Sequence, residues 1–181
     1  MKHTKKTAVL LIALLLLTTF SLSARQRSIA VGAQLGFTTS GAIVDVGLGN
    51  LYIQAGIGYP LGLTYIASQT DFEDKLFDIY TFNLDISQAY ALSDNFDIKL
   101  GLGTTAFTNF GPVILGLAGP VVKGEYWIPN KNIGLFVNLN VPVMAYGLIE
   151  GDDTFDGAVV FDGLLPLLGL ITSTVGVLYS F

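Results

Sequence analysis

Apolar side chains recur at every second position in short segments of this chain, and glycine, proline, asparagine or aspartate interrupts the segments. A period of two is the pattern of a β-strand with one apolar and one polar face. Eight such segments can be counted, at residues 29–38, 44–48, 51–58, 80–87, 96–103, 113–128, 133–141 and 175–181. The sequence therefore predicts an all-β protein.

Composition narrows this prediction. The chain is 51% hydrophobic and 13% charged, and its mean hydropathy is +0.61. After residue 24, no apolar stretch reaches the roughly 18 residues that a membrane-spanning helix needs. A membrane protein without such helices must close its strands into a barrel, because only closure pairs every backbone group away from water. We therefore predict a transmembrane, antiparallel, up-and-down β-barrel of eight strands with both termini on the periplasmic side.

Residues 1–24 have the three parts of a secretory signal peptide. They open with lysines, continue in an apolar run at 8–17 and end in small residues that suit cleavage. The alternative, an uncleaved anchor, conflicts with the shortness of that run. The chain has no cysteine, which excludes both a lipidated cysteine and disulfides. We predict a signal peptide at 1–24 and one barrel domain at 25–181.

Charge and connection lengths add two expectations. Residues 25–181 carry six basic and 14 acidic residues, a net charge of −8, which argues against a nucleic-acid partner. Short turns are expected in the periplasm and longer links outside. The short turns are at 49–50, 93–95 and 129–132, and the longer links are at 67–75, 106–112 and 144–157. Aromatic residues near the short turns are predicted to form an interfacial girdle: Tyr52, Tyr90, Phe96, Tyr126, Trp127, Tyr179 and Phe181.

The last segment places Val175, Val177, Tyr179 and Phe181 on one face. A strand that ends in this way resembles the insertion signal that the barrel-assembly machinery reads. With the signal peptide and the alternating rows, the chain resembles the small eight-stranded outer-membrane barrels, such as the transmembrane part of outer-membrane protein A and the proteins X and W. The resemblance implies a location in the bacterial outer membrane and contact with its lipid and lipopolysaccharide. It does not identify a subfamily.

Catalysis is not expected. Small barrels that act on lipid A use a catalytic histidine, and the only histidine here is His3, inside the predicted signal peptide. Without histidine or cysteine after residue 24, Ser–His, Cys–His and histidine-bearing metal sites are unavailable. Paired carboxylates are the one catalytic alternative that these residues leave open. We therefore predict a non-enzymatic protein without a cofactor.

Six charged residues fall on the polar rows and are predicted to point into the barrel: Asp45, Asp85, Asp97, Lys99, Lys123 and Glu125. Buried charges are costly unless they pair, and an eight-stranded barrel is just wide enough for side chains to fill it. These charges predict a plugged lumen held by salt bridges. The alternative is a narrow polar path whose net negative lining favours small cations.

Two links are acidic and are candidate sites for an external ligand, or for divalent ions that bridge to lipopolysaccharide phosphates. Their acidic residues are Asp71, Glu73, Asp74, Glu150, Asp152, Asp153 and Asp156. The stretch from Asp152 resembles the start of a calcium loop, but its twelfth position is Gly163 where the bidentate glutamate belongs. A solvated loop is therefore the favoured interpretation.

Prolines interrupt the strand pattern at Pro60, Pro120, Pro142 and Pro166. Because proline has no N–H for the ladder, each marks a strand end, a bulge or a local opening of the wall. Pro120 and Pro166 are predicted to frame a possible lateral opening. The sequence therefore favours a structural or surface-binding outer-membrane barrel, and the alternative is a porin-like channel or a lateral route for small hydrophobic molecules.

Overall fold

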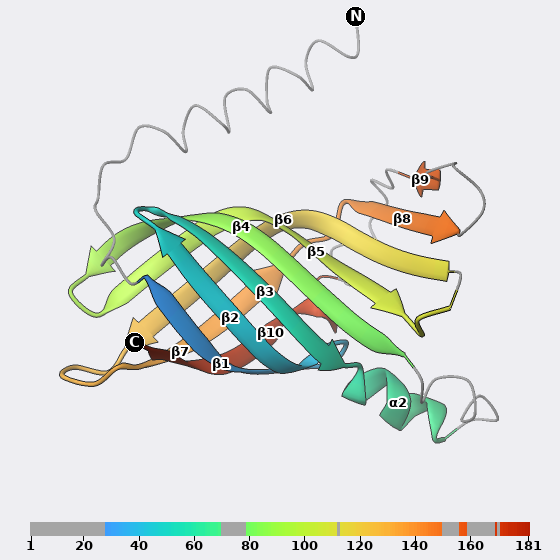
Figure 1. Ribbon diagram of the computed structural model, residues 1–181, viewed down its shortest axis with the longest axis horizontal. Coiled ribbons are helices and arrows are strands. Elements are labelled where there is room, and N and C mark those ends of the chain that lie inside the picture. Colours follow the sequence, from blue (N-terminus) through green and yellow to red (C-terminus); the bar gives the residue numbers. More distant parts are fainter. Residues whose placement is uncertain (1–27, 70–78, 112, 150–155, 159–168, 170) are drawn as a thin grey trace, which may run out of the picture.

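The computed structural model describes residues 28–69, 79–111, 113–149, 156–158, 169 and 171–181, and these contain ten β-strands and the short helix α2 (Figure 1). The strands are β1 (Ile29–Gly36), β2 (Ser40–Leu48), β3 (Leu51–Tyr59), β4 (Tyr80–Ser93), β5 (Phe96–Thr108), β6 (Val113–Trp127), β7 (Ile133–Asn140), β8 (Met144–Ile149), β9 (Asp156–Ala158) and β10 (Thr174–Ser180). The helix is α2 (Leu61–Ala67). The predicted signal peptide lies outside the described residues.

The strands close into a barrel. Each strand from β1 to β6 pairs antiparallel with the strand that follows it in the chain. β10 pairs antiparallel with both β1 and β7. Because β7 and β8 follow one another along the same side of β6, the wall has eight strands. The predicted eight-stranded, antiparallel, up-and-down barrel is confirmed.

The pairing is staggered around the ring. Starting from Leu117 on β6, the paired residues lead once around the barrel and return to β6 at Trp127, ten residues farther along. A stagger of this kind tilts the strands by about 35–45° from the barrel axis. The tilt brings residues distant in sequence to the same level of the lumen.

Two predicted links are wrong in part. The link expected at 106–112 begins later, because β5 continues to Thr108 in register with β6. Residues 144–157 were expected to form a long loop, but β8 occupies their first part and continues the ladder along β6. The strand is interrupted only at Val141–Val143, where proline occurs. The pairing of β7 with β10 ends at Asn138, which pairs with Thr174. Farther along, β8 pairs with β9.

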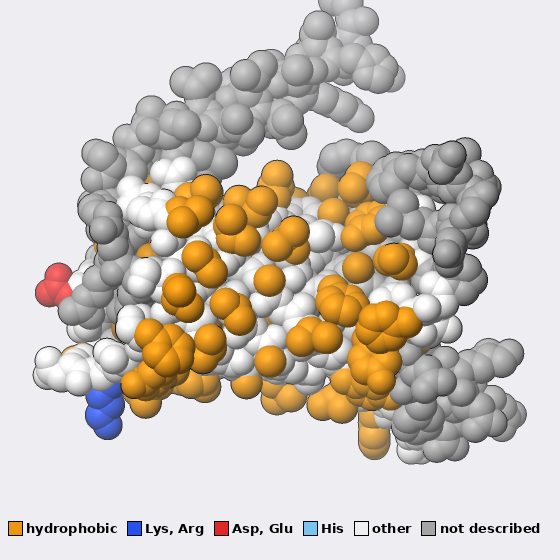
Figure 2. Space-filling view, in the orientation of Figure 1, with side chains coloured by type: hydrophobic (Ala, Val, Ile, Leu, Met, Phe, Trp, Pro, Cys, Tyr) orange, Lys and Arg blue, Asp and Glu red, His pale blue; other side chains and the backbone are white. Residues whose placement is uncertain are grey.

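The outward rows are apolar. Exposed large side chains on the wall include Val31, Leu35, Val44, Ile57, Leu84, Ile86, Leu102, Leu135, Val137, Val175 and Val177. Figure 2 shows hydrophobic side chains across the visible wall and charged side chains only near one end. Of the charged residues that the structure describes, those on the wall strands are buried, Asp94 and Lys131 lie in short turns, and Asp156 lies on β9. No helix among the described residues is long and apolar enough to cross a membrane.

Three members of the predicted girdle are buried. Tyr52 and Trp127 are only 5% and 2% exposed, because they share the inward rows with Gln54 and Glu125, and Tyr90 is 8% exposed. Tyr126, Tyr179 and Phe181 are exposed on the outer wall, as expected. Phe181 donates its backbone N–H to the carbonyl oxygen of Ile29 at 3.2 Å, so the first and last described strands meet at the end with the short turns (Figure 1).

Candidate functional site

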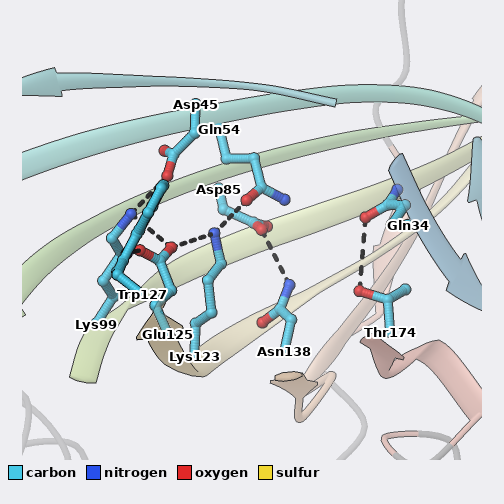
Figure 3. Close-up of polar contacts among 10 residues, drawn as sticks. All are labelled: Gln34, Asp45, Gln54, Asp85, Lys99, Lys123, Glu125, Trp127, Asn138 and Thr174. Atoms are coloured by element: carbon cyan, nitrogen blue, oxygen red, sulfur yellow. Dashed lines mark hydrogen bonds and ion pairs between the residues drawn. The ribbon is translucent and has the colours of Figure 1, made fainter. Parts of the chain in front are cut away.

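The barrel interior contains all six charged residues that the sequence predicted to point inward. Alternation on β2, β4, β5 and β6 turns them toward the axis, and each is at most 5% exposed: Asp45, Asp85, Asp97, Lys99, Lys123 and Glu125. The structure brings four of them into one charged cluster, Asp45, Lys99, Glu125 and Lys123 (Figure 3). Asp97 is buried beside Glu125 in the β5–β6 register, and Asp85 binds a different partner.

Lys99 is at the centre of the charged cluster. Its Nζ lies 2.5 Å from Asp45 Oδ2 and 2.7 Å from Glu125 Oε1. The same ammonium lies 3.7 Å from the centre of the Tyr52 ring, a distance at which the ring face attracts a cation. A lysine ammonium has three donors. Lys99 therefore has two carboxylates and one aromatic face as partners.

Lys123 contacts one carboxylate and one neutral amide, whereas Lys99 contacts two carboxylates. Its Nζ donates a hydrogen bond to Gln54 Oε1 and lies 3.7 Å from Glu125 Oε1. Trp127 Nε1 donates to the other oxygen of Glu125 at 3.3 Å, which fixes that carboxylate between two lysines and an indole. Glu125 thus joins the two lysines into one network.

These contacts cross the lumen. Lys99 on β5 reaches Asp45 on β2, Lys123 on β6 reaches Gln54 on β3, and Asn138 on β7 donates to Asp85 on β4 at 3.2 Å. None of these strand pairs are neighbours in the barrel wall. The side chains therefore tie opposite walls together, as Figure 3 shows.

A second chain of hydrogen bonds lies farther from the short turns than the charged cluster does. It is nearer the opposite end of the barrel, called the loop end below. Thr174 donates to Gln34 at 3.5 Å, Gln34 to Asn83 at 3.4 Å and Asn83 to Thr105 at 3.2 Å. The Gln34 side chain passes over Gly56 on its way to β4. A Cβ at position 56 would lie 3.2 Å from the Gln34 amide nitrogen, so the glycine leaves room for this side chain. Neutral side chains thus bridge the lumen at this level as well.

Glycines make room for the large interior side chains. A Cβ at Gly134 would lie 2.8 Å from the Trp127 ring, and one at Gly176 would lie 2.5 Å from the Phe136 ring. These distances are shorter than normal carbon contacts, so the rings occupy the space that a side chain would take. The lumen at the short-turn end is filled by Trp127, Tyr52, Phe136 and Leu178 together with the charged cluster.

Sequence reasoning did not single out the neutral members of the site. Gln34, Gln54 and Asn138 lie on the predicted polar rows, and that position was the only available signal, since they carry no charge. Tyr52 and Trp127 were assigned to the girdle because aromatic residues near strand ends are common at membrane interfaces. Their alternation with Gln54 and Glu125 was the better signal, because a period of two fixes the face.

Pro120 lies on β6 in unbroken register with Leu102 on β5. Its carbonyl accepts a hydrogen bond from Val141 N at 2.9 Å, but proline has no N–H to return that bond to the Val141 carbonyl. Pro120 therefore faces the interruption between β7 and β8. Pro166 and nearly all the acidic link residues lie outside the described residues. Of the two prolines predicted to frame a lateral opening, the structure describes Pro120.

Within the described part of the chain, no group of three or more acidic, histidine or cysteine side chains could hold a metal ion. Comparison with protein-family models, with curated proteins and with solved structures finds no match.

Proposed function

We propose that this chain is a non-enzymatic integral protein of the bacterial outer membrane, with a structural or surface-binding role. The observation that carries the proposal is the inverted distribution of side chains. The described wall strands expose apolar residues and bury their charged ones. A water-soluble protein has the opposite arrangement, whereas a transmembrane barrel needs an apolar outer face and tolerates a polar interior.

Two aromatic belts support the membrane assignment. One consists of Phe96, Tyr126, Tyr179 and Phe181 at the short-turn end. The other consists of Tyr59, Tyr80, Phe82 and Phe110, whose neighbouring rings lie 5.1–6.2 Å apart. From Phe96 to Ala106, which pairs with Phe82, the chain runs ten residues along β5. That length is about 33 Å of strand, or about 25 Å along the axis at a tilt near 40°, which matches the apolar band of outer-membrane barrels.

The closed lumen favours a structural or binding role over conduction. Ion pairs and hydrogen bonds join opposite walls at two levels, and rings fill the short-turn end. An ion could pass only if several buried contacts opened together. A binding role would then use the loop end, where lipopolysaccharide or an external ligand can reach the acidic links.

Reconstitution tests this proposal. The full-length chain, refolded into lipid vesicles, should migrate differently on gels before and after heating, as intact barrels do. In planar bilayers it should give no conductance above that of bare lipid. A chain that refolds fully in buffer without lipid or detergent would contradict the membrane assignment, and steady conductance would contradict the closed lumen.

A second function is favoured by one feature of the wall. The ladder between β6 and the β7–β8 strand, called the seam here, lacks one hydrogen bond at Pro120. On the other side of β7, the pairing with β10 ends at Asn138, close to the interruption at Val141–Val143. A weakened seam there would suit a lateral route for small hydrophobic molecules. Uptake of a hydrophobic probe into vesicles would distinguish this function from the first.

A further inference from the structure

Asp85 differs from the two acids of the charged cluster, Asp45 and Glu125. Asp45 and Glu125 each lie within 2.7 Å of a lysine Nζ, whereas no such ion pair within 4 Å is formed by Asp85 among the described residues. Its carboxylate accepts a hydrogen bond from Asn138 Nδ2 at 3.2 Å, and its side chain is nevertheless buried, with 4% of the residue exposed. Lys123 directs its ammonium to Gln54 and Glu125 instead.

The charge of Asp85 has no lysine at ion-pair distance among the described residues. Lys99 contacts Asp45 and Glu125, and Lys123 contacts Gln54 and Glu125. An ionised carboxylate away from water is costly unless a positive charge compensates it. A compensating cation near Asp85 would remove part of this cost.

Two amide oxygens on the inward face of β7, the strand whose Asn138 contacts Asp85, lack hydrogen-bond partners among the described residues. Because a carboxylate only accepts hydrogen bonds, Asn138 must turn its NH₂ toward Asp85 and its Oδ1 away from that bond. Within the described part of the chain, Asn138 Oδ1 accepts no hydrogen bond, and neither does Oδ1 of Asn140, which lies two residues farther along the same face of β7. Both side chains are buried, at 6% and 4% exposed. Unpaired buried oxygens of this kind call for a donor or a cation.

We propose that Asp85 and Asn138, with Asn140 as a further ligand, bind one small monovalent cation of the sodium type. Carboxylate and amide oxygens are the ligands of hard cations. One carboxylate matches one positive charge, whereas a divalent ion would leave an excess of positive charge at this point. Residues two apart on a strand lie about 7 Å apart, so the two amides can approach one ion from neighbouring positions.

Linkage between binding and unfolding tests the proposal. The full-length chain is refolded in detergent micelles and unfolded in urea at constant ionic strength, with sodium chloride replaced stepwise by choline chloride. Choline is a quaternary ammonium ion whose methyl groups keep oxygen ligands away from its charge, so it is the control cation. If one ion binds only the folded barrel, each tenfold rise in sodium above the dissociation constant should lower the unfolding equilibrium constant about tenfold.

Asp85→Asn should abolish this sodium dependence, because it removes the charge that the cation balances. Asp94→Asn, in an exposed turn, is the matched control and should keep the wild-type dependence. Asn140→Leu is a second variant, which should weaken the dependence without touching the carboxylate and keeps the test valid if Asp85→Asn does not fold.

Equal stability in sodium and choline would overturn the proposal, and so would an unchanged sodium response in Asp85→Asn. An infrared carbonyl band of a protonated carboxylic acid, present in the wild type and lost in Asp85→Asn, would show that a proton takes the place of the cation. The site lies inside the barrel whatever surrounds the wall, so its failure would leave the proposed membrane role intact.

Discussion

Each lysine in the lumen contacts more than one polar side chain. The number of contacts determines how much removal of the lysine would lower the free energy of unfolding. Lys99 compensates Asp45 and Glu125, and its ammonium lies over the Tyr52 ring. A buried ion pair adds little net stability compared with an apolar pair of the same shape. Removing one member is different, because the remaining charges stay buried without compensation.

Lys99→Met should therefore lower the free energy of unfolding by about 3–5 kcal/mol, measured by urea unfolding in micelles. The matched control is Lys131→Met, in an exposed turn, which should unfold with nearly the wild-type midpoint. An unchanged midpoint for Lys99→Met would mean that this ammonium is in contact with bulk water and that the inward row has been misassigned.

Alternation predicted which side chains share a face, since a period of two leaves only two choices. It could not predict which acid meets which lysine. Lys99 and Asp45 are 54 residues apart in sequence and meet across the lumen, so their contact depends on the stagger of the whole ring. Asp85 shows the same limit, because its partner Asn138 carries no charge and its place on a polar row does not identify its partner.

At the scale of elements, the strands were predictable and their ends were not. The β7–β8 strand was predicted to stop near the proline at position 142, yet it resumes at Met144 because β6 continues beside it and offers hydrogen-bonding partners. The helix α2 was not predicted. It has seven residues, no side-chain cap and no charged residue in its first or last turn that suits the helix dipole, so the usual signals are missing.

The helix α2 exposes Leu61, Tyr65 and Ile66 at 50%, 70% and 53%. It follows β3 directly, next to the aromatic belt at the loop end (Figure 1). A short uncharged helix with apolar side chains beside such a belt suits the boundary between head groups and acyl chains. We expect α2 to lie in that boundary when the barrel is in a bilayer.

The lack of cysteine makes this measurable, because a single introduced cysteine can be labelled alone. A spin label on Tyr65→Cys should be more accessible to oxygen and less accessible to a water-soluble relaxant than a label on Asp94→Cys in a turn. Leu84→Cys, on the outer wall, gives the reference for the bilayer interior. A label at position 65 with the water accessibility of the Asp94→Cys label would place α2 in solvent.

The seam at Pro120 supports the next prediction. Pro120→Val supplies the missing N–H and keeps an apolar outward side chain. If the seam is only structural, the variant should be as stable as the wild type or more stable by about 0.5–1.5 kcal/mol, the value of one hydrogen bond. Neither protein should then admit a hydrophobic probe faster than empty vesicles.

The control is Leu102→Val, which alters the surface opposite Pro120 without adding a donor. Probe uptake that is present in the wild type and in Leu102→Val, but lost in folded Pro120→Val, would establish the lateral route and displace the structural role.

For the whole molecule, the surroundings of the wall decide how a charge on it behaves. In water, an arginine on an exposed wall position should cost little. In a bilayer, it should cost about 2–4 kcal/mol at the midplane and about 0–1 kcal/mol near the interface. The dependence on depth is therefore the signature of a membrane, independent of any particular ligand or loop.

Ile86 and Leu48 provide the two depths. Both are exposed on the outer wall, at 49% and 60%. Ile86 lies well inside the band between the aromatic belts, and Leu48 ends β2 at a short turn. Unfolding from lipid vesicles should show a large loss of stability for Ile86→Arg and a small one for Leu48→Arg. Equal and small losses would mean that water surrounds the wall, and this result would contradict the membrane assignment.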